Sequence, residues 1–157
     1  MIAICCMTSI AYAGQEIVGG LGVSLGDPVD ESMVFIGEDK QGHQNYAFRE
    51  GSTNEFFSDY WVKATHKTKV IFGIYADHRY NNWKDCEDRY LILETALNKK
   101  YDQDHNSTGW YYIKDDRRIR LACYDRNGTA LLQLEYSDDL LKTKSLEEKA
   151  EEISDSL

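Results

Sequence analysis

The sequence predicts a single α+β domain in which an antiparallel β-sheet is packed by one central helix, about 83–100, and by a C-terminal helix, about 138–156. Three observations lead to this prediction. Apolar and polar residues alternate in several short segments, as they do in half-buried strands. The period changes to that of a helix in the two segments just named. Asn127-Gly128 is a strong local signal for a β-hairpin turn.

Residues 1–13 are expected to be a secretion signal. They form an uncharged, largely apolar run that ends in Ala11-Tyr12-Ala13, the small-x-small pattern that signal peptidase cuts. The run is short and no Lys or Arg precedes it, and an upstream start codon or a trimmed N-terminus would explain both features. Residues 14–157 would then be the mature domain, in the periplasm or secreted. The alternative is an apolar first strand of a cytosolic protein. Lipidation of Cys5 or Cys6 is poorly supported, because neither follows a small residue.

The formal net charge of −9 narrows the choice of partner. Nucleic acids and anionic membranes attract basic surfaces, so neither is expected as a partner. No apolar run approaches the ~20 residues of a membrane span. The charge favours a protein partner, with a basic one preferred, although many exported proteins are acidic for solubility alone. The sequence does not indicate the oligomeric state.

The first half of the domain reads as a series of short strands. Residues 17–25 are expected to form a first strand that ends at the turn Gly26-Asp27-Pro28. Two stretches rich in aromatic and β-branched residues follow later and are expected to pair through a hairpin. The expected elements are a helical turn at 29–33, short strands at 33–36 and 45–48, and the strong pair 56–64 and 70–76 joined by 65–69.

The second half combines helices with a second hairpin. Asn82 is the expected N-cap of the central helix, and Asp85 suits its first turn. Strands are expected at 110–113, at 118–123 and, after the Asn127-Gly128 turn, at 130–136. In the tail, Ser145 and Glu148 form a capping-box pattern, so the C-terminal helix is expected to be continuous, kinked or restarted at that point. Its apolar stripe is Leu146, Ala150, Ile153 and Leu157.

A disulfide is expected between Cys86 and Cys123. Cys86 lies on the helix stripe that also contains Leu93 and Leu97, and Cys123 lies on the apolar face of a strand. Packing the helix on the sheet brings the two sulfur atoms together, and an oxidising compartment would join them. Such a bridge would stabilise the fold by roughly 4 kcal/mol. The alternative is a pair of free, buried cysteines.

Catalytic and metal-binding patterns are weak, and neither a catalytic residue nor a cofactor is predicted. The histidines are not at ligand spacing. Gly22-Val23-Ser24-Leu25-Gly26 spells a nucleophile elbow, but it lies in a strand-like run and no helix follows it. Asp102, Asp104 and Asn106 resemble the opening of a calcium loop, whose later positions do not match. We therefore treat those three as weak candidates and expect no metal.

Clustered aromatic residues are the best candidates for partner contact. Adjacent residues of a strand point to opposite sides of the sheet, so aromatic neighbours cannot all enter the core. Exposed Tyr and Trp are typical of protein-binding hot spots, although core packing explains many such residues. The candidate contact residues are Tyr60, Trp61, Trp110, Tyr111 and Tyr112.

About half of the chain, residues 60–138, resembles small exported proteins of Gram-negative bacteria that have no assigned function. The resemblance rests on Val62-x-x-Thr65, the 70–74 strand, Cys86, Leu93-x-x-x-Leu97-x-x-Lys100-Tyr101, Leu121-x-Cys123 and Leu134-x-Tyr136-x-Asp138. It implies export, the disulfide and the α+β fold, and it implies no chemistry.

Three functions are weighed on these observations. The first is a non-enzymatic exported binding protein that acts by protein–protein contact, as an inhibitor, an immunity protein or an envelope accessory protein. The second is a periplasmic module that binds a small ligand, a sugar or a metal. The third and weakest is a small hydrolase.

Overall fold

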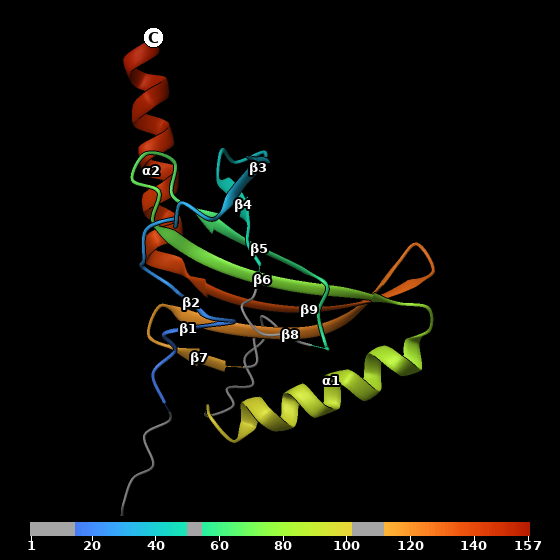
Figure 1. Ribbon diagram of the computed structural model, residues 1–157. Helices are drawn as coiled ribbons and strands as arrows, with labels where there is room; N and C mark the ends of the chain where they lie inside the picture. Colours follow the sequence, from blue (N-terminus) through green and yellow to red (C-terminus); the bar gives the residue numbers. More distant parts are fainter. Residues whose placement is uncertain (1–14, 50–54, 102–111) are drawn as a thin grey trace, which may run out of the picture.

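The computed structural model describes residues 15–49, 55–101 and 112–157 (Figure 1). Its elements are the strands β1 (Gly19–Gly20), β2 (Val23–Ser24), β3 (Val34–Glu38), β4 (Gln44–Ala47), β5 (Asp59–Ala64), β6 (Ile71–Tyr80), β7 (Tyr112–Lys114), β8 (Arg117–Arg126) and β9 (Thr129–Asp138), with the helices α1 (Trp83–Asn98) and α2 (Asp139–Ser156). The predicted class is confirmed: the fold is α+β, with antiparallel sheets, a central helix, a C-terminal helix and one disulfide.

Seven strands form the main sheet in the order β3-β4-β5-β6-β9-β8-β7. All neighbouring strands are antiparallel. Consecutive strands pair as hairpins except at β6, whose partner β9 comes after α1, β7 and β8 in the chain. The two long hairpins that the sequence predicts are therefore joined edge to edge, and β6 and β9 lie at the centre of the sheet.

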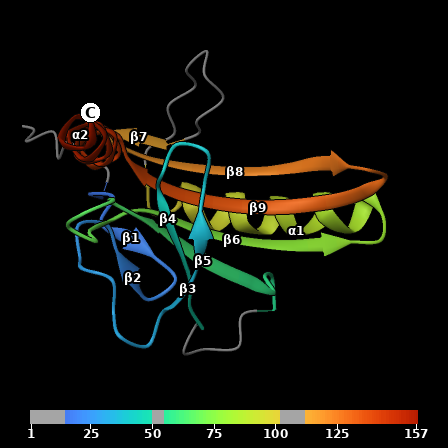
Figure 2. The same cartoon turned by 90° about the horizontal axis from the view of Figure 1, so that it is seen from above.

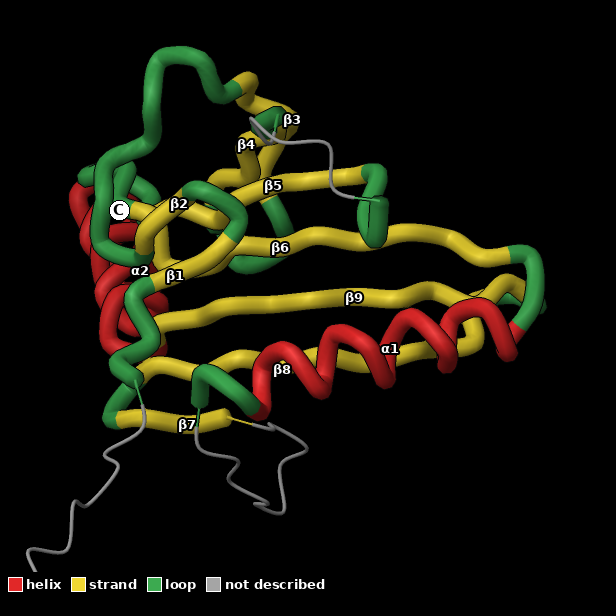
Figure 3. Tube along the Cα trace, turned by 60° about the horizontal axis from the view of Figure 1, so that its bottom comes forward, coloured by secondary structure: helices red, strands yellow, loops and turns green. Residues whose placement is uncertain are grey.

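The core lies between α1 and one face of this sheet. Alternate residues of β6 and β9, such as Ile74 and Leu134, are buried on that face. The helix begins at its predicted N-cap, since the side chain of Asn82 accepts a hydrogen bond from the Asp85 N–H at 2.9 Å. Figure 3 shows α1 and the β1–β2 hairpin on the same side of the main sheet.

The disulfide joins α1 to β8 as predicted. Cys86 lies in the first turns of the helix and is fully buried, and Cys123 lies opposite Leu132 in the β8–β9 pairing. The two Cα atoms are 6.2 Å apart. The bridge therefore fixes the start of the helix to the sheet at the layer interface.

Residues 17–25 do not form the predicted single strand. Leu21 and Gly22 both have positive φ, so the chain reverses there and makes the two-stranded β1–β2 hairpin. Ile17 and Leu25, at the two ends of the hairpin, are buried in the core. The glycine-rich centre of the segment is thus a turn, and the two apolar ends of the segment enter the core.

α2 is one continuous helix of 18 residues, without a restart at Ser145. Its N-cap is Asp138, whose side chain accepts a hydrogen bond from the Leu141 N–H at 3.0 Å. The predicted apolar stripe does not face the protein, since Leu146 and Ile153 are exposed and Ser145 is buried. Neither helix of the described residues is long and apolar enough to cross a membrane.

Candidate binding surface

The main sheet has an open face on the side away from α1. Figure 2 looks onto this face, and within the described residues no helix lies over β6, β9 or β8 there. α2 stands at one end of the sheet and is seen end-on in the same view. Because alternate residues of a strand point to opposite faces, the apolar residues enter the core on one face and the aromatic and charged residues lie on the open face.

A row of four residues crosses the open face, one from each of four adjacent strands. The register pairs Trp61 of β5 with Tyr75 of β6. It pairs Tyr75 with Glu135 of β9, and Glu135 with Arg120 of β8. We call these four residues the cross-strand row. Directly opposed residues interact through their side chains, so the row forms a continuous strip across the sheet.

The aromatic half of the cross-strand row is tightly organised. The rings of Trp61 and Tyr75 are stacked, with centroids 5.3 Å apart and an interplanar angle of 7°. The ammonium group of Lys63 lies 5.6 Å from the centroid of Tyr75. Gly73 makes room for this arrangement, because a Cβ atom at that position would lie 2.7 Å from Cε2 of Tyr75. The Tyr75 ring therefore occupies space beside Gly73 that any larger residue would fill.

The charged half of the cross-strand row is partly shielded from solvent. The Tyr75 hydroxyl donates a hydrogen bond to Oε1 of Glu135 at 3.2 Å. Burial raises the pKa of Glu135 above its ordinary value, although the Tyr75 hydrogen bond and the positive charge of Arg120 act in the opposite direction. Burial, followed by the charge of Glu135, also raises the pKa of Tyr75 well above its ordinary value. The guanidinium carbon of Arg120 lies 5.0 Å from the ring centroid of Tyr124.

The structure places the predicted contact residues in different environments. Trp61 lies on the open face. Tyr60, its neighbour, points to the other side, where its hydroxyl donates to the Phe57 carbonyl at 3.1 Å. Tyr112 is buried, and its hydroxyl donates to Oδ1 of Asn98 at 2.7 Å, so it belongs to the core. Trp110 and Tyr111 lie outside the described residues.

Sequence reasoning did not select the other members of the cross-strand row. Tyr75 alternates with the apolar residues Ile74 and Ala76, and Glu135 alternates with Leu134 and Tyr136. That alternation places Tyr75 and Glu135 on the outer face. It does not show that they oppose each other, because the register of β6 against β9 depends on the whole fold.

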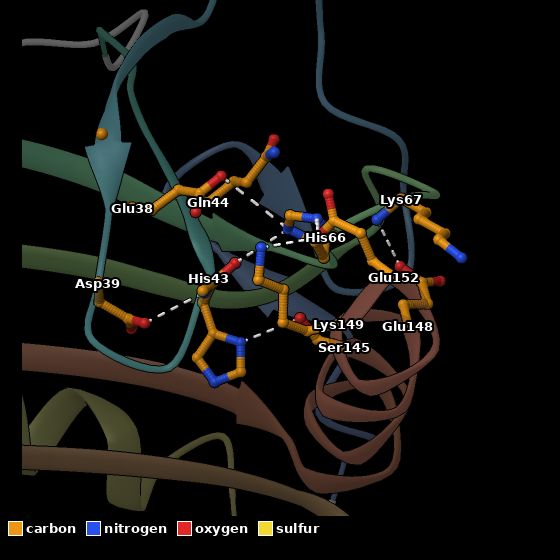
Figure 4. Close-up of polar contacts among 12 residues, drawn as sticks. Glu38, Asp39, His43, Gln44, His66, Lys67, Ser145, Glu148, Lys149 and Glu152 are labelled. Atoms are coloured by element: carbon orange, nitrogen blue, oxygen red, sulfur yellow. Dashed lines mark hydrogen bonds and ion pairs between the residues drawn. The ribbon is translucent and has the colours of Figure 1, made fainter. Parts of the chain in front are cut away.

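A second cluster of polar groups docks α2 against the sheet (Figure 4). Nδ1 of His43 lies 2.9 Å from Oγ of Ser145, and both side chains are buried. The carboxylate of Asp39 accepts a hydrogen bond from the backbone N–H of His43 rather than from its ring. Burial lowers the pKa of His43, which favours the neutral form of its ring. The His43–Ser145 contact therefore joins the turn between β3 and β4 to α2 inside the protein.

Glu148 provides the strongest polar link of α2. Its carboxylate accepts hydrogen bonds from the N–H groups of Lys67 and Thr68, at 2.6 and 3.2 Å, and from the Thr68 hydroxyl at 2.7 Å. Burial alone would raise the pKa of Glu148, but these hydrogen bonds lower it below the ordinary value. The capping-box glutamate of the sequence thus caps the turn between β5 and β6 instead of its own helix.

A hollow of about 500 Å³ lies beside the β1–β2 hairpin. Apolar side chains and the charged groups of Asp30 and Arg49 line it together, the apolar ones including Leu21, Met33 and Phe48. Within residues 15–49, 55–101 and 112–157, no group of three or more His, Cys, Asp or Glu is placed to hold a metal ion. The weak calcium candidates Asp102, Asp104 and Asn106 lie outside the described residues.

Comparison with known proteins yields no matching family model, no matching curated protein and no matching solved structure.

Proposed function

We propose that this chain is an exported, non-enzymatic binding protein that acts by protein–protein contact, as an inhibitor, an immunity protein or an envelope accessory protein of the periplasm or the secreted fraction. The observation that carries the proposal is the cross-strand row on the open face. It offers a large aromatic stack in fixed geometry, bordered by charged groups, and this combination is typical of binding hot spots.

Two further properties support the proposal. The Cys86–Cys123 disulfide is compatible with an oxidising compartment outside the cytosol. The net charge of −9 would speed association with a basic partner and would make that association sensitive to salt. Rigid side chains such as a stacked Trp lose little conformational freedom on binding, which favours affinity.

The test is recovery of a stoichiometric partner from an envelope extract by the immobilised, oxidised protein. The variant Trp61→Ala should lose the partner, because it removes the ring that stacks on Tyr75. Trp83→Ala is the matched control, since Trp83 is an exposed tryptophan on α1. Equal recovery by both variants, or no partner with the unmodified protein, would contradict the proposal.

The hollow beside the β1–β2 hairpin favours a second candidate, a small-ligand-binding module. Its mixed apolar and charged lining is that of many ligand pockets. A panel of sugars and small metabolites would raise the melting temperature of the protein if one of them binds there. The shift should disappear in the variant Met33→Trp, which would fill the hollow, and should persist in Trp61→Ala.

A further inference from the structure

The turn between β8 and β9 consists of two exposed residues, Asn127 and Gly128. Arg126, the last residue of β8, pairs with Thr129, the first residue of β9, so the turn has no other member. Asn127 and Gly128 both have positive φ, 58° and 79°, as a type I′ turn requires. Figure 1 shows the turn at the end of the sheet opposite α2.

This end of the hairpin lies outside the core. Ala130 is the first buried residue of β9, and Asp125, its partner on β8, is exposed. Apart from the two chain neighbours of Gly128, no described residue lies within 4 Å of the position that a Cβ atom would take there. Exposed ends with few contacts open at a small fraction of the free energy of global unfolding. The turn can therefore open without unfolding the sheet.

An asparagine followed by a glycine can modify itself. The backbone nitrogen of the glycine attacks Cγ of the asparagine side chain, and a new N–C bond forms. The side-chain nitrogen leaves as ammonia and takes up the proton of the attacking amide. Water then opens the five-membered succinimide at one of its two carbonyls, which gives aspartate or isoaspartate. The reaction consumes one water and releases one ammonia, and glycine favours it because no Cβ blocks the approach of its nitrogen.

The carboxylate of Asp125 restrains the attacking nitrogen in this turn. The N–H of Gly128 donates a hydrogen bond to Oδ1 of Asp125 at 2.9 Å. Attack on Asn127 requires that this nitrogen release its proton and turn toward Cγ, and both changes break the hydrogen bond. The negative charge of Asp125 also disfavours the negatively charged nitrogen that forms when the proton leaves. The closed turn is thus a protected state, and modification proceeds from the open turn.

We propose that Asn127 is a self-modification site, where attack by the Gly128 nitrogen gives aspartate or isoaspartate, and that the hydrogen bond to Asp125 sets the rate in the folded protein. The site is independent of the proposed binding function. Isoaspartate directs the main chain through the side-chain carbons and lengthens the turn by one atom, so the pairing of Arg126 with Thr129 should change. Aspartate leaves the backbone unchanged and adds a negative charge beside Asp125.

The test compares the full, oxidised chain with a synthetic peptide of residues 124–131, both incubated at mildly alkaline pH. Peptide mapping by mass spectrometry measures the deamidated fraction at each asparagine, and water enriched in heavy oxygen labels the product through the oxygen that enters. The variant Asp125→Ala removes the acceptor of the Gly128 hydrogen bond, whereas Asp125→Asn keeps an oxygen acceptor without the charge. The control Asp155→Ala removes the same charge from an exposed position on α2.

We expect Asn127 to convert in the folded chain at least about tenfold more slowly than in the peptide, because the turn must first open. Asp125→Ala should convert about twofold to tenfold faster than the unmodified chain, the range that one hydrogen bond provides. Asp125→Asn should fall between these two rates, and Asp155→Ala should match the unmodified chain. Hydrogen exchange of the Gly128 amide should also speed up in Asp125→Ala.

Several results would overturn the inference. An unchanged rate in Asp125→Ala would remove the role of Asp125, and a slower rate would show that its carboxylate accepts the proton and promotes the attack. Equal rates in the peptide and the folded chain would refute protection by the turn. If Asn127 stays unmodified in both the folded chain and Asp125→Ala while the peptide converts, it is not a modification site. The recovery experiment with Trp61→Ala decides the proposed function separately.

Discussion

The hydroxyl of Tyr75 and the carboxylate of Glu135 share a 3.2 Å hydrogen bond in the middle of the open face, between the two central strands of the sheet. Tyr75 is also stacked on Trp61, so the hydrogen bond connects the aromatic half of the cross-strand row to its charged half. A change in either residue should therefore be detected at the other.

Glu135→Gln should flatten the pH dependence of stability. The pKa of Glu135 is raised in the folded protein, mainly by burial, so the folded state holds this proton more tightly than the unfolded state. The free energy of unfolding then falls as pH rises from the ordinary glutamate range through the raised pKa, and it levels off above that. Urea unfolding between pH 4 and pH 8 measures the slope.

The control for this experiment is Glu31→Gln, which changes an exposed glutamate. Asp77, whose pKa burial also raises, contributes to the slope in every variant and cancels in the comparison. Parallel pH profiles for Glu135→Gln and the unmodified protein would refute the assignment.

Gly73→Ala should disturb the aromatic stack. The new methyl group would lie 2.7 Å from Cε2 of Tyr75, so the ring must leave its present position in the stack with Trp61. We expect the free energy of unfolding to fall by about 1–3 kcal/mol, as is usual for overpacking, together with a change in tryptophan fluorescence. In the background Tyr75→Ala the same substitution should cost much less, and a double-mutant cycle measures the difference. Additive effects would contradict the steric explanation.

Replacing both Cys86 and Cys123 with alanine should lower the free energy of unfolding by roughly 4 kcal/mol. The bridge closes a loop with a sequence separation of 37, and losing it restores conformational freedom to the unfolded chain. Denaturant unfolding of the oxidised, reduced and doubly substituted proteins checks the value. The reduced and substituted forms should agree closely, and a large gap between them would mean that loss of the side chains contributes more than loss of the bond.

Glu148→Ala should loosen α2 without unfolding the sheet. It removes the acceptor for three hydrogen bonds from Lys67 and Thr68. Because these donors lose their partner, we expect the free energy of unfolding to fall by about 1–3 kcal/mol. Hydrogen exchange should speed up in α2 and in the turn between β5 and β6. Because hydrogen bonding lowers the pKa of Glu148, this contribution is present above the ordinary glutamate pKa and is lost as pH falls.

The neighbouring substitution Glu147→Ala provides the control, because Glu147 is exposed on the same helix. It should leave the exchange of α2 near that of the unmodified protein. Similar acceleration in both variants would indicate that the loss of a negative charge on α2, rather than the loss of docking, is responsible.

Local signals account for the elements that the sequence predicts well. Asn82 and Asp85 define the start of α1, and Asn127, with its positive φ, turns β8 into β9. The Cys86–Cys123 pairing followed from two separate apolar stripes that had to meet at one interface. The helix start and the turn needed only a few neighbouring residues, and the disulfide needed two local stripes together with the requirement that both enter one core.

The features that sequence reasoning missed depend on distant partners. The stripe of Leu146 and Ile153 predicted the buried side of α2, but the helix docks through Ser145 and Glu148, whose partners lie about 80 to 100 residues earlier. The cross-strand row likewise requires the register of four strands at once. Alternation shows which face a residue takes and leaves its opposite neighbour undetermined.

The disulfide also closes residues 86–123 into a covalent ring. One tail outside the ring contains β1–β6, and the other contains β9 and α2. A protease that cuts one peptide bond inside this ring produces no separate fragment. Nicked molecules would migrate with intact ones on a denaturing gel and would separate into two bands only after reduction.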